Sequence, residues 1–234
     1  MIKGVDISRY QTPVNFATMK AGGIEFAIFR GYFDTIADKT FPVYHADAVK
    51  EGLIRGVYHF VDYRDNPVSQ AALLGLLYNQ YPCEAGAWCD LEYYQPFGTF
   101  TRANILSWLY RYFSEVEDKT GRVCGLYANA NMVASVLKPV PRWLLEKPLW
   151  IAHWGNSLTA PLIGEWPSWV FWQHTDKGDG KALGVSSLDL DMDRYNGSLS
   201  DLRAWCGMEV ITPMLTLEAR VARLEKAVFG AEPD

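Results

Sequence analysis

Short apolar runs recur along the chain, and longer amphipathic stretches separate the first of them. The runs are rich in β-branched and aromatic residues, a composition that favours strands. Five runs cover residues 3–8, 26–32, 54–60, 87–92 and 123–129. Three more follow with little helical pattern between them, at 148–155, 169–175 and 186–193. The pattern therefore predicts eight strands, with a strand-rich last part.

The stretches between the early strands carry apolar residues at the spacing of amphipathic helices. They lie around residues 41–51, 67–81 and 101–119. Thr101 and Asn66, which precedes Pro67, are suitable residues to begin two of these helices. Strands that alternate with helices predict a parallel sheet, and eight strands predict a β/α barrel with incomplete helical cover.

The character of the sequence changes near Cys206. The segment that follows carries apolar residues at alternating spacings of three and four: Met214, Leu217, Val221, Leu224 and Val228. This is the heptad pattern of a coiled coil, but it extends over only about two heptads, so a helix that packs on the barrel explains it equally well. We assign residues 1–207 to the barrel and 208–234 to a C-terminal helical tail, through which homo-oligomerisation is a hypothesis.

Composition and charge exclude several classes of protein. The net charge is −5 and no Lys/Arg-rich run is present, which argues against a nucleic-acid partner. The four cysteines form no CxxC pair and have no histidine at zinc-ligand spacing. We therefore expect no metal, and we expect the cysteines to be buried free thiols. The N-terminus lacks the apolar region of a signal peptide, and no apolar run approaches the ~18 residues of a membrane span. We expect a soluble product made in the cytoplasm, with no membrane partner.

The aromatic content is high, with nine Trp and thirteen Tyr. Such side chains stack well on the faces of ligands, sugars among them, although most of them would pack inside the barrel. Composition alone therefore does not identify a ligand.

Two carboxylates, Asp90 and Glu92, end an apolar strand. Because side chains alternate along a strand, both point to the same face. Cleavage of a glycosidic bond usually requires two carboxyl groups, one of which must be protonated. The neighbouring negative charge and the apolar Trp88 would raise one carboxyl pKa, and the longer Glu92 is the predicted proton donor.

An Asp-x-Glu motif is common, so its context decides how much it means. Asp6 and Asp191 end the first and last predicted strands, which are neighbours in a closed barrel. They would add two carboxylates to the same cleft. A parallel barrel carries its active site at the carboxyl ends of its strands.

Further polar residues end the other predicted strands and are candidates for the site. They are Arg30, Tyr58, His59, Tyr127, His153 and Gln173. No carboxylate spacing typical of a zinc site accompanies the two histidines, and satisfied rim histidines are the simpler interpretation. The sequence also lacks a G-x-S-x-G elbow and a Gly-rich phosphate loop, which argues against an esterase or a nucleotide enzyme.

Seven motifs in order resemble those of glycoside hydrolase family 25, the Chalaropsis-type lysozymes, many of them phage endolysins. The motifs are KGVDIS-x-YQ at 3–11, FAIFRGY at 26–32, GVYHF at 56–60, DLE at 90–92, LYAN at 126–129, LWIAHWG at 149–155 and FWQHT at 171–175. The ending DMDRYNG at 191–197 is similar to that family's Asp-x-Asn-x-Phe-x-Gly. The resemblance covers residues 3 to about 205. It implies a flattened, TIM-like barrel of eight strands and about five helices, without a metal or an organic cofactor.

The implied activity is cleavage of the β-1,4 bond from N-acetylmuramic acid to N-acetylglucosamine in peptidoglycan, with retention. By this resemblance Glu92 is the acid/base, Asp90 orients a substrate N-acetyl group that acts as nucleophile, and Asp6 and Asp191 tune the cleft. Direct attack by Asp90 stays open, because it depends on a carboxyl separation of ~5–5.5 Å that sequence does not give. The predicted substrate-binding residues are Tyr58, Tyr127, Trp150, Gln173, Arg30 and His59.

The chain departs from the family's pattern at four positions. Asp193 stands where Asn is usual, His153 and His174 stand where Tyr is common, and Asp189 adds a carboxylate before Asp191. These departures leave the subsite preference and the pH optimum open.

Two other functions are compatible with the sequence. One is a catalytically idle barrel that binds glycan or forms part of a virion, against which Asp90 and Glu92 argue. The other is a hydrolase of chitin or another N-acetylhexosamine polymer, although a chitinase D-x-x-D-x-D-x-E motif is not found. The N-terminus fits a phage lysin that reaches the cell wall with a helper or as a virion component, and a bacterial host protein is also compatible.

Overall fold

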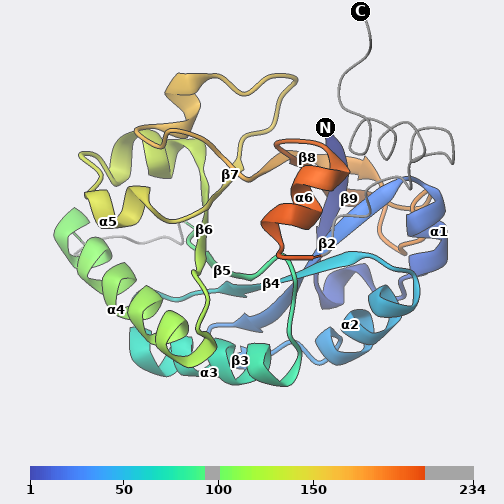
Figure 1. Cartoon of the computed structure of the whole chain (residues 1–234), viewed down its shortest axis with the longest axis horizontal. Coiled ribbons are helices and arrows are strands. Elements are labelled where there is room, and N and C mark those ends of the chain that lie inside the picture. The colour runs from blue at the N-terminus through green and yellow to red at the C-terminus, as the bar shows by residue number, and fades with distance from the viewer. Residues whose placement is uncertain (93–100, 209–234) are drawn as a thin grey trace, which may run out of the picture.

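Eight strands close into a barrel in the computed structural model, which describes residues 1–92 and 101–208 (Figure 1). They are β1 (Ile2–Ile7), β2 (Ile24–Phe33), β4 (Ile54–Phe60), β5 (Ala87–Asp90), β6 (Gly125–Asn129), β7 (Leu149–Ala152), β8 (Phe171–Asp179) and β9 (Asp189–Tyr195). Their order is β1-β9-β8-β7-β6-β5-β4-β2, and pairing of β1 with β2 closes the ring. The short β3 (Ile36–Ala37) pairs only with β2. The predicted eight-stranded, TIM-like barrel is confirmed.

The sheet is not wholly parallel, which corrects the expectation from the sequence. β9 runs antiparallel to both β8 and β1. Only nine residues, 180–188, separate β8 from β9, which is too short for the crossover that a parallel strand needs. Asp191 therefore lies near the beginning of its strand rather than at the end. It is nevertheless the register partner of Asp6, so both residues reach the same rim of the barrel.

Six α-helices lie in the described residues, one more than the five or so expected. They are α1 (Phe16–Ala21), α2 (Phe41–Lys50), α3 (Pro67–Gln80), α4 (Arg102–Thr120), α5 (Arg142–Leu145) and α6 (Leu199–Trp205). Three short helical segments are also present: η1 (Arg9–Gln11) and η3 (Ala160–Ile163) are 3-10 turns, and η2 (Met132–Val136) is a π-helix. The three predicted helices and the caps Asn66 and Thr101 are confirmed, since each cap side chain accepts a backbone N–H bond.

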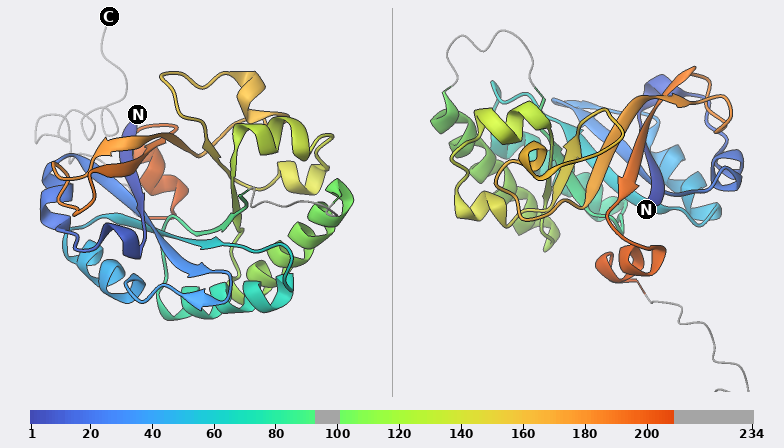
Figure 2. Two further views of the ribbon diagram at one scale, coloured as in Figure 1. Left: turned by 180° about the vertical axis from the view of Figure 1, so that it is seen from behind. Right: turned by 90° about the horizontal axis from the view of Figure 1, so that it is seen from above.

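The helices cover the barrel unevenly. α2, α3 and α4 flank one side of it, whereas β8 and β9 have little helical cover (Figure 1). α6 lies beneath the barrel at the amino-terminal ends of the parallel strands (Figure 2), where Leu202 and Cys206 join the cluster that includes Trp88. The opposite end, where the parallel strands finish, is left for the site.

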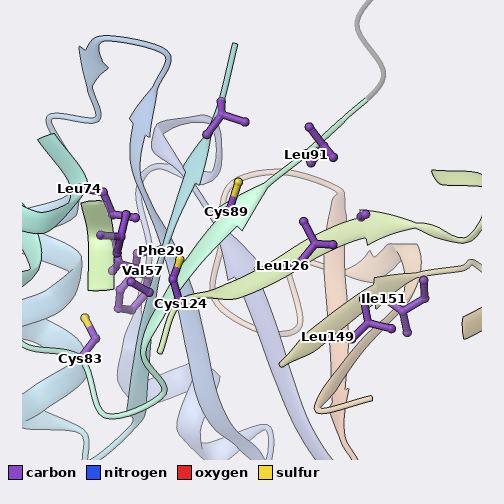
Figure 3. Packing of buried hydrophobic residues seen from close by; sticks show 14 of the residues in the cluster. Phe29, Val57, Leu74, Cys83, Cys89, Leu91, Cys124, Leu126, Leu149 and Ile151 are labelled. Atoms are coloured by element: carbon purple, nitrogen blue, oxygen red, sulfur yellow. The ribbon is translucent and has the colours of Figure 1, made fainter. Parts of the chain in front are cut away.

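Alternation along the strands builds two apolar layers. Phe26, Trp88, Trp150 and Phe171 fill the inside of the barrel. Phe29, Val57, Cys89, Leu126 and Ile151 pack outside it, against the helices (Figure 3). The rings inside the barrel leave no room for a side chain at Gly125, because a Cβ there would lie 2.3 Å from the ring of Trp88. All four cysteines are free and buried, as predicted.

Within residues 1–92 and 101–208, no helix has the length and apolar character needed to cross a membrane. The same residues contain no cluster of three or more His, Cys, Asp or Glu side chains suited to a metal ion. Apart from Met208, the predicted C-terminal tail and its proposed oligomer contacts lie outside the described residues.

Candidate active site

Four carboxyl groups line one cavity of about 250 Å³ at the carboxyl end of the barrel. Asp6 comes from β1 and Asp191 from β9. Asp90 is the last residue of β5, and Glu92 follows it two residues later. Asp90 and Glu92 share a face because one residue, the buried Leu91, separates them. The structure thus brings together the four carboxylates that the sequence singled out.

Burial raises the pKa of these carboxyl groups. For Asp90 the pKa lies well above its ordinary value because of burial and then the nearby charge of Glu92, while the Arg30 guanidinium acts in the opposite direction. Burial also raises the pKa of Glu92, against a hydrogen bond from Tyr127 that favours its ionised form. For Asp191, burial and the charge of Asp176 raise the pKa to about 6. The cavity therefore favours the protonated forms of these carboxyl groups more than water does.

One oxygen of Asp90 is buried without a partner. Its Oδ1 accepts no hydrogen bond from any described residue. A buried, unpaired carboxylate oxygen is costly and calls for an explanation. Because Asp90 lines the cavity, a donor group of a ligand is the natural partner for this atom.

Gln173 connects the floor of the cavity to its walls. Its amide nitrogen donates to Asp6 Oδ2 at 2.8 Å. Its amide oxygen accepts from the Tyr127 hydroxyl at 3.0 Å and from Trp154 Nε1 at 3.2 Å. The Tyr127 hydroxyl also lies near Glu92 and favours the ionised form of that carboxyl group. A continuous chain of polar contacts therefore runs from Asp6 to the predicted proton donor.

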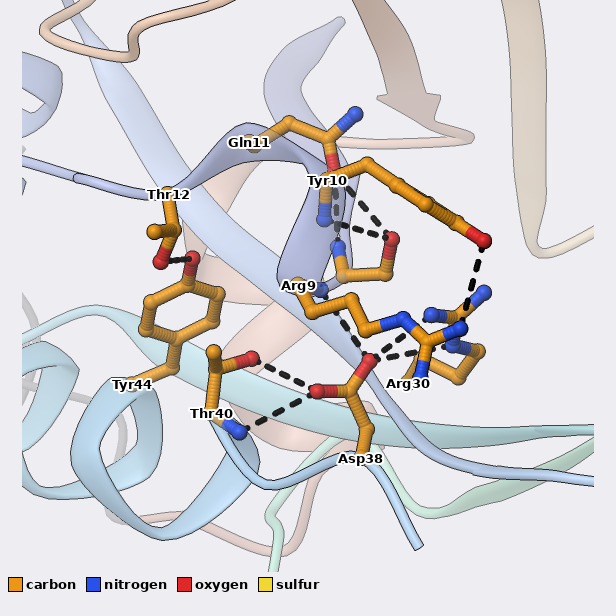
Figure 4. A network of polar contacts seen from close by, with 9 residues as sticks. Arg9, Tyr10, Gln11, Thr12, Arg30, Asp38, Thr40 and Tyr44 are labelled. Carbon is orange, nitrogen blue, oxygen red and sulfur yellow. Dashed lines mark hydrogen bonds and ion pairs between the residues drawn. The ribbon is translucent and has the colours of Figure 1, made fainter. Parts of the chain in front are cut away.

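Arg30 lines the same cavity and is held by a buried ion pair (Figure 4). Its Nε and Nη2 donate to Asp38 Oδ2 at 3.0 and 2.9 Å, and its guanidinium lies 5.1 Å from the centre of the Tyr10 ring. Asp38 also accepts bonds from Arg9 and Thr40. Burial alone would raise the pKa of Asp38, but these bonds and the Arg30 charge outweigh it and lower the pKa.

Replacing Asp38 with Ala should lower the free energy of unfolding by about 3 kcal/mol, because it leaves the buried Arg30 charge without its partner. Urea denaturation of the variant and the wild type measures this. Asp47, whose ion pair with Lys50 is exposed, is the control, and Asp47→Ala should cost less than about 1 kcal/mol. Equal losses in the two variants would contradict the importance of the buried pair.

His59 does not line the cavity, which corrects its prediction as a substrate-binding residue. It follows Tyr58 directly in β4, so the two side chains point to opposite faces of the strand. Tyr58 faces the cavity, whereas His59 is fully buried between the barrel and α4, bonded to Tyr112 at 3.0 Å and to the Asp34 carbonyl at 2.7 Å. Burial lowers its pKa to about 4, which suits a neutral structural histidine.

Trp150 lies at the edge of the cavity but is almost entirely buried. Its ring packs 4.5 Å from that of Tyr127, and its Nε1 donates to Asp193 at 2.8 Å. It therefore forms a wall rather than a stacking surface. Asp189 lines neither this cavity nor the next, and its exposed carboxylate pairs with Lys177.

A second cavity of about 450 Å³ adjoins the first, with Glu92, Tyr127 and Trp154 common to both. Its remaining walls are Asn129, Ala130, Asn131, Ala152 and His153. Sequence reasoning did not select Trp154, whose side chain is 60 % exposed. Its position just beyond the carboxyl end of β7 was the available signal, since such loops form the site in parallel barrels.

Paired carboxyl groups at the carboxyl ends of parallel barrel strands are what a glycoside hydrolase requires. The sequence profile of the glycosyl hydrolases family 25 matches residues 5–183. The chain belongs to this family, and the family named from the sequence motifs is confirmed.

Named relatives agree with this assignment, and a solved structure shares the fold. Lysozyme M1 of Streptomyces globisporus is 27% identical over 219 residues, which cover 87% of this chain and 70% of the relative. The N,O-diacetylmuramidase of Chalaropsis sp is 25% identical over 86% of this chain and 97% of its own. The muramidase from Trichobolus zukalii has the same fold, with a TM-score of 0.75 and 24% identity, over 88% of this chain and 99% of the other.

Proposed function

We propose that this glycoside hydrolase is an N-acetylmuramidase that cleaves the β-1,4 bond between N-acetylmuramic acid and N-acetylglucosamine in bacterial cell-wall peptidoglycan. The observation that carries the proposal is the pair Asp90 and Glu92, which line one cavity of a family 25 barrel and have raised pKa values. The names of the similar lysozyme and diacetylmuramidases support this choice of substrate.

Glu92 is the proposed general acid and base. It lies where the two cavities join, so a glycan that occupies both has a glycosidic bond beside this carboxyl group. Its raised pKa keeps a proton available for the oxygen of the leaving sugar. After the leaving sugar departs, the ionised Glu92 can take a proton from the attacking water.

Asp90 is proposed to hold the substrate's N-acetyl group. Its unpaired Oδ1 can accept the amide N–H, and this orients the carbonyl oxygen toward the anomeric carbon. The carbonyl oxygen then forms a bond to that carbon as the glycosidic bond breaks, and water later opens the cyclic intermediate. Two displacements at one carbon give retention of configuration.

Retention is tested by following the anomeric protons of the sugar released from a soluble peptidoglycan fragment. The β-anomer must appear first and then mutarotate. An initial α-anomer would mean a single displacement by water and would contradict the role given to the N-acetyl group.

Replacing Tyr127 with Phe should move the alkaline limb of the pH–activity profile to higher pH. The Tyr127 hydroxyl favours the ionised form of Glu92, so its removal raises the pKa of Glu92 further and keeps the acid protonated longer. Measurement of kcat/KM from pH 4 to 9 for Tyr127→Phe and wild type tests this. Tyr110→Phe, an exposed residue on α4, is the control. A limb that stays in place or moves to lower pH would contradict the contact's role.

A further inference from the structure

Asp193 lies beneath the cavity and has no cationic partner. It is fully buried on β9, two residues deeper in the barrel than Asp191, and thus on the same face. Its Oδ1 accepts a hydrogen bond from Trp150 Nε1, while Oδ2 accepts none from a described N–H or hydroxyl group. Among the described residues, no Lys, Arg or His forms an ion pair with it. A lone carboxylate in such a place is strongly disfavoured.

The carboxyl group of Asp6 lies within hydrogen-bonding reach of Asp193. An ionised carboxylate only accepts hydrogen bonds, so two ionised groups cannot bond to each other. With one proton on the pair, one carboxyl group becomes a donor, and the contact becomes a short, charge-assisted bond. The pair then carries a single negative charge.

We propose that Asp193 is a positioning residue that shares one proton with Asp6 and, through this contact, fixes the floor of the catalytic cavity. The shared proton then holds Asp6 on one side, and Gln173 Nε2 donates to it on the other. Gln173 in turn bonds to Tyr127, which contacts Glu92. The shared proton thus does the work of an amide N–H, which an Asn at position 193 would supply permanently.

The groups that surround the pair agree with a retained proton. Asp191 of β9 is the other charged group that acts on both members, and like them it is acidic. The other strands contribute neutral groups: Trp150 of β7 donates to Asp193, and Gln173 of β8 donates to Asp6. The hydroxyls of Tyr58 and Tyr127 lie near Asp6, and burial raises their pKa well above the ordinary value.

Burial, offset in part by the Trp150 bond, raises the pKa of Asp193 to about 7. Burial, and then the charges of Asp191 and Asp193, raise the pKa of Asp6 as well. The pair therefore holds its proton in mildly acidic solution and becomes more negative as the pH rises past neutrality.

Loss of the proton has a defined cost. Because the pKa of Asp193 is raised on folding, the folded chain binds more protons than the unfolded chain between about pH 4 and 7, and stability falls as the pH rises through that range. Asp193→Asn removes this loss, since an amide does not ionise and still donates to Asp6. The deprotonated pair also repels itself, which displaces Asp6 from Gln173.

The test compares melting temperatures of the wild type, Asp193→Asn and Asp189→Asn at each pH from 4 to 8. We expect Asp193→Asn to match the wild type near pH 4 and to exceed it by more than about 3 °C at pH 8. Asp189→Asn makes the same change at the exposed start of β9, and its melting temperature should vary with pH as that of the wild type does. Parallel curves for all three proteins would overturn the proposal.

A second readout separates positioning from stability alone and rests on the proposed function. The activity of Asp193→Asn relative to wild type should rise at least threefold between pH 5 and pH 8, with both proteins assayed well below their melting temperatures. A constant ratio would overturn the positioning role. If neither protein cleaves peptidoglycan, the proposed function fails, while the melting curves still decide whether the proton is shared.

Discussion

Glu92→Gln is expected to lower the turnover of peptidoglycan by about a thousandfold, the range that a general acid contributes. Gln has nearly the volume of Glu but carries no acidic proton, so the leaving sugar must depart as an alkoxide. Binding should change little, because Glu92 contributes one wall among many in the two cavities. The loss should therefore fall on kcat and leave KM within about threefold.

The rate of release of new reducing ends from soluble peptidoglycan fragments measures this loss. Glu146→Gln is the control. It makes the same chemical change at an exposed residue, which forms an ion pair with Arg142, and it should retain full activity. Near wild-type turnover by Glu92→Gln, with Glu146→Gln also active, would remove Glu92 from the reaction. A large loss in both variants would mean that folding, not chemistry, had been disturbed.

Asp90→Asn is expected to lower kcat by roughly a hundredfold or more, the size of effect typical of a lost electrostatic contact to a transition state. A neutral amide cannot stabilise the positive charge that develops on the N-acetyl group. Its NH₂ group would also face the substrate N–H, so that one hydrogen-bond donor meets another. Asp118→Asn, on the exposed face of α4, is the matched control.

The same substitution should make the protein more stable at neutral pH. Burial and the charge of Glu92 raise the pKa of Asp90, so the folded state binds protons that the unfolded state releases. That contribution to stability is lost as the pH rises, and Asn abolishes the loss. Melting temperatures at pH 5 and 8 test this, and the gain must be larger at pH 8. Lower stability together with lower activity would contradict the account of Asp90.

The sequence was sufficient to predict the carboxyl cluster because strand alternation is a short-range rule. Asp90 and Glu92 are two residues apart, and this separation alone places them on one face. The same rule separates Tyr58 from His59, so one of the two adjacent residues had to lie outside the cavity. Which residue faced inward depended on the register of β4 against its neighbours, and strand periodicity does not give that register.

Other features depend on contacts that a pattern of hydrophobic residues does not encode. Periodicity carries no direction, so the antiparallel course of β9 was not predicted. α1 and α6 are less than two turns long and show too little periodicity to detect. The ion pair of Arg30 with Asp38 joins a strand to an irregular segment. The sequence showed Asp193 only as an unusual residue in a family motif. Its contact with Asp6 was not predicted, because Asp6 comes from the first strand of the barrel and Asp193 from the last.

The central claim is that the chain cleaves muramyl bonds with Glu92 as the proton donor. Mass spectrometry of purified peptidoglycan after digestion and borohydride reduction tests it most directly, with wild type and Glu92→Gln side by side. Reduced muramic-acid ends from the wild type alone are the predicted result. Reduced glucosamine ends would contradict the bond assignment, and no new ends from either protein would contradict the muramidase function itself, with chitin oligomers as the next substrate to assay.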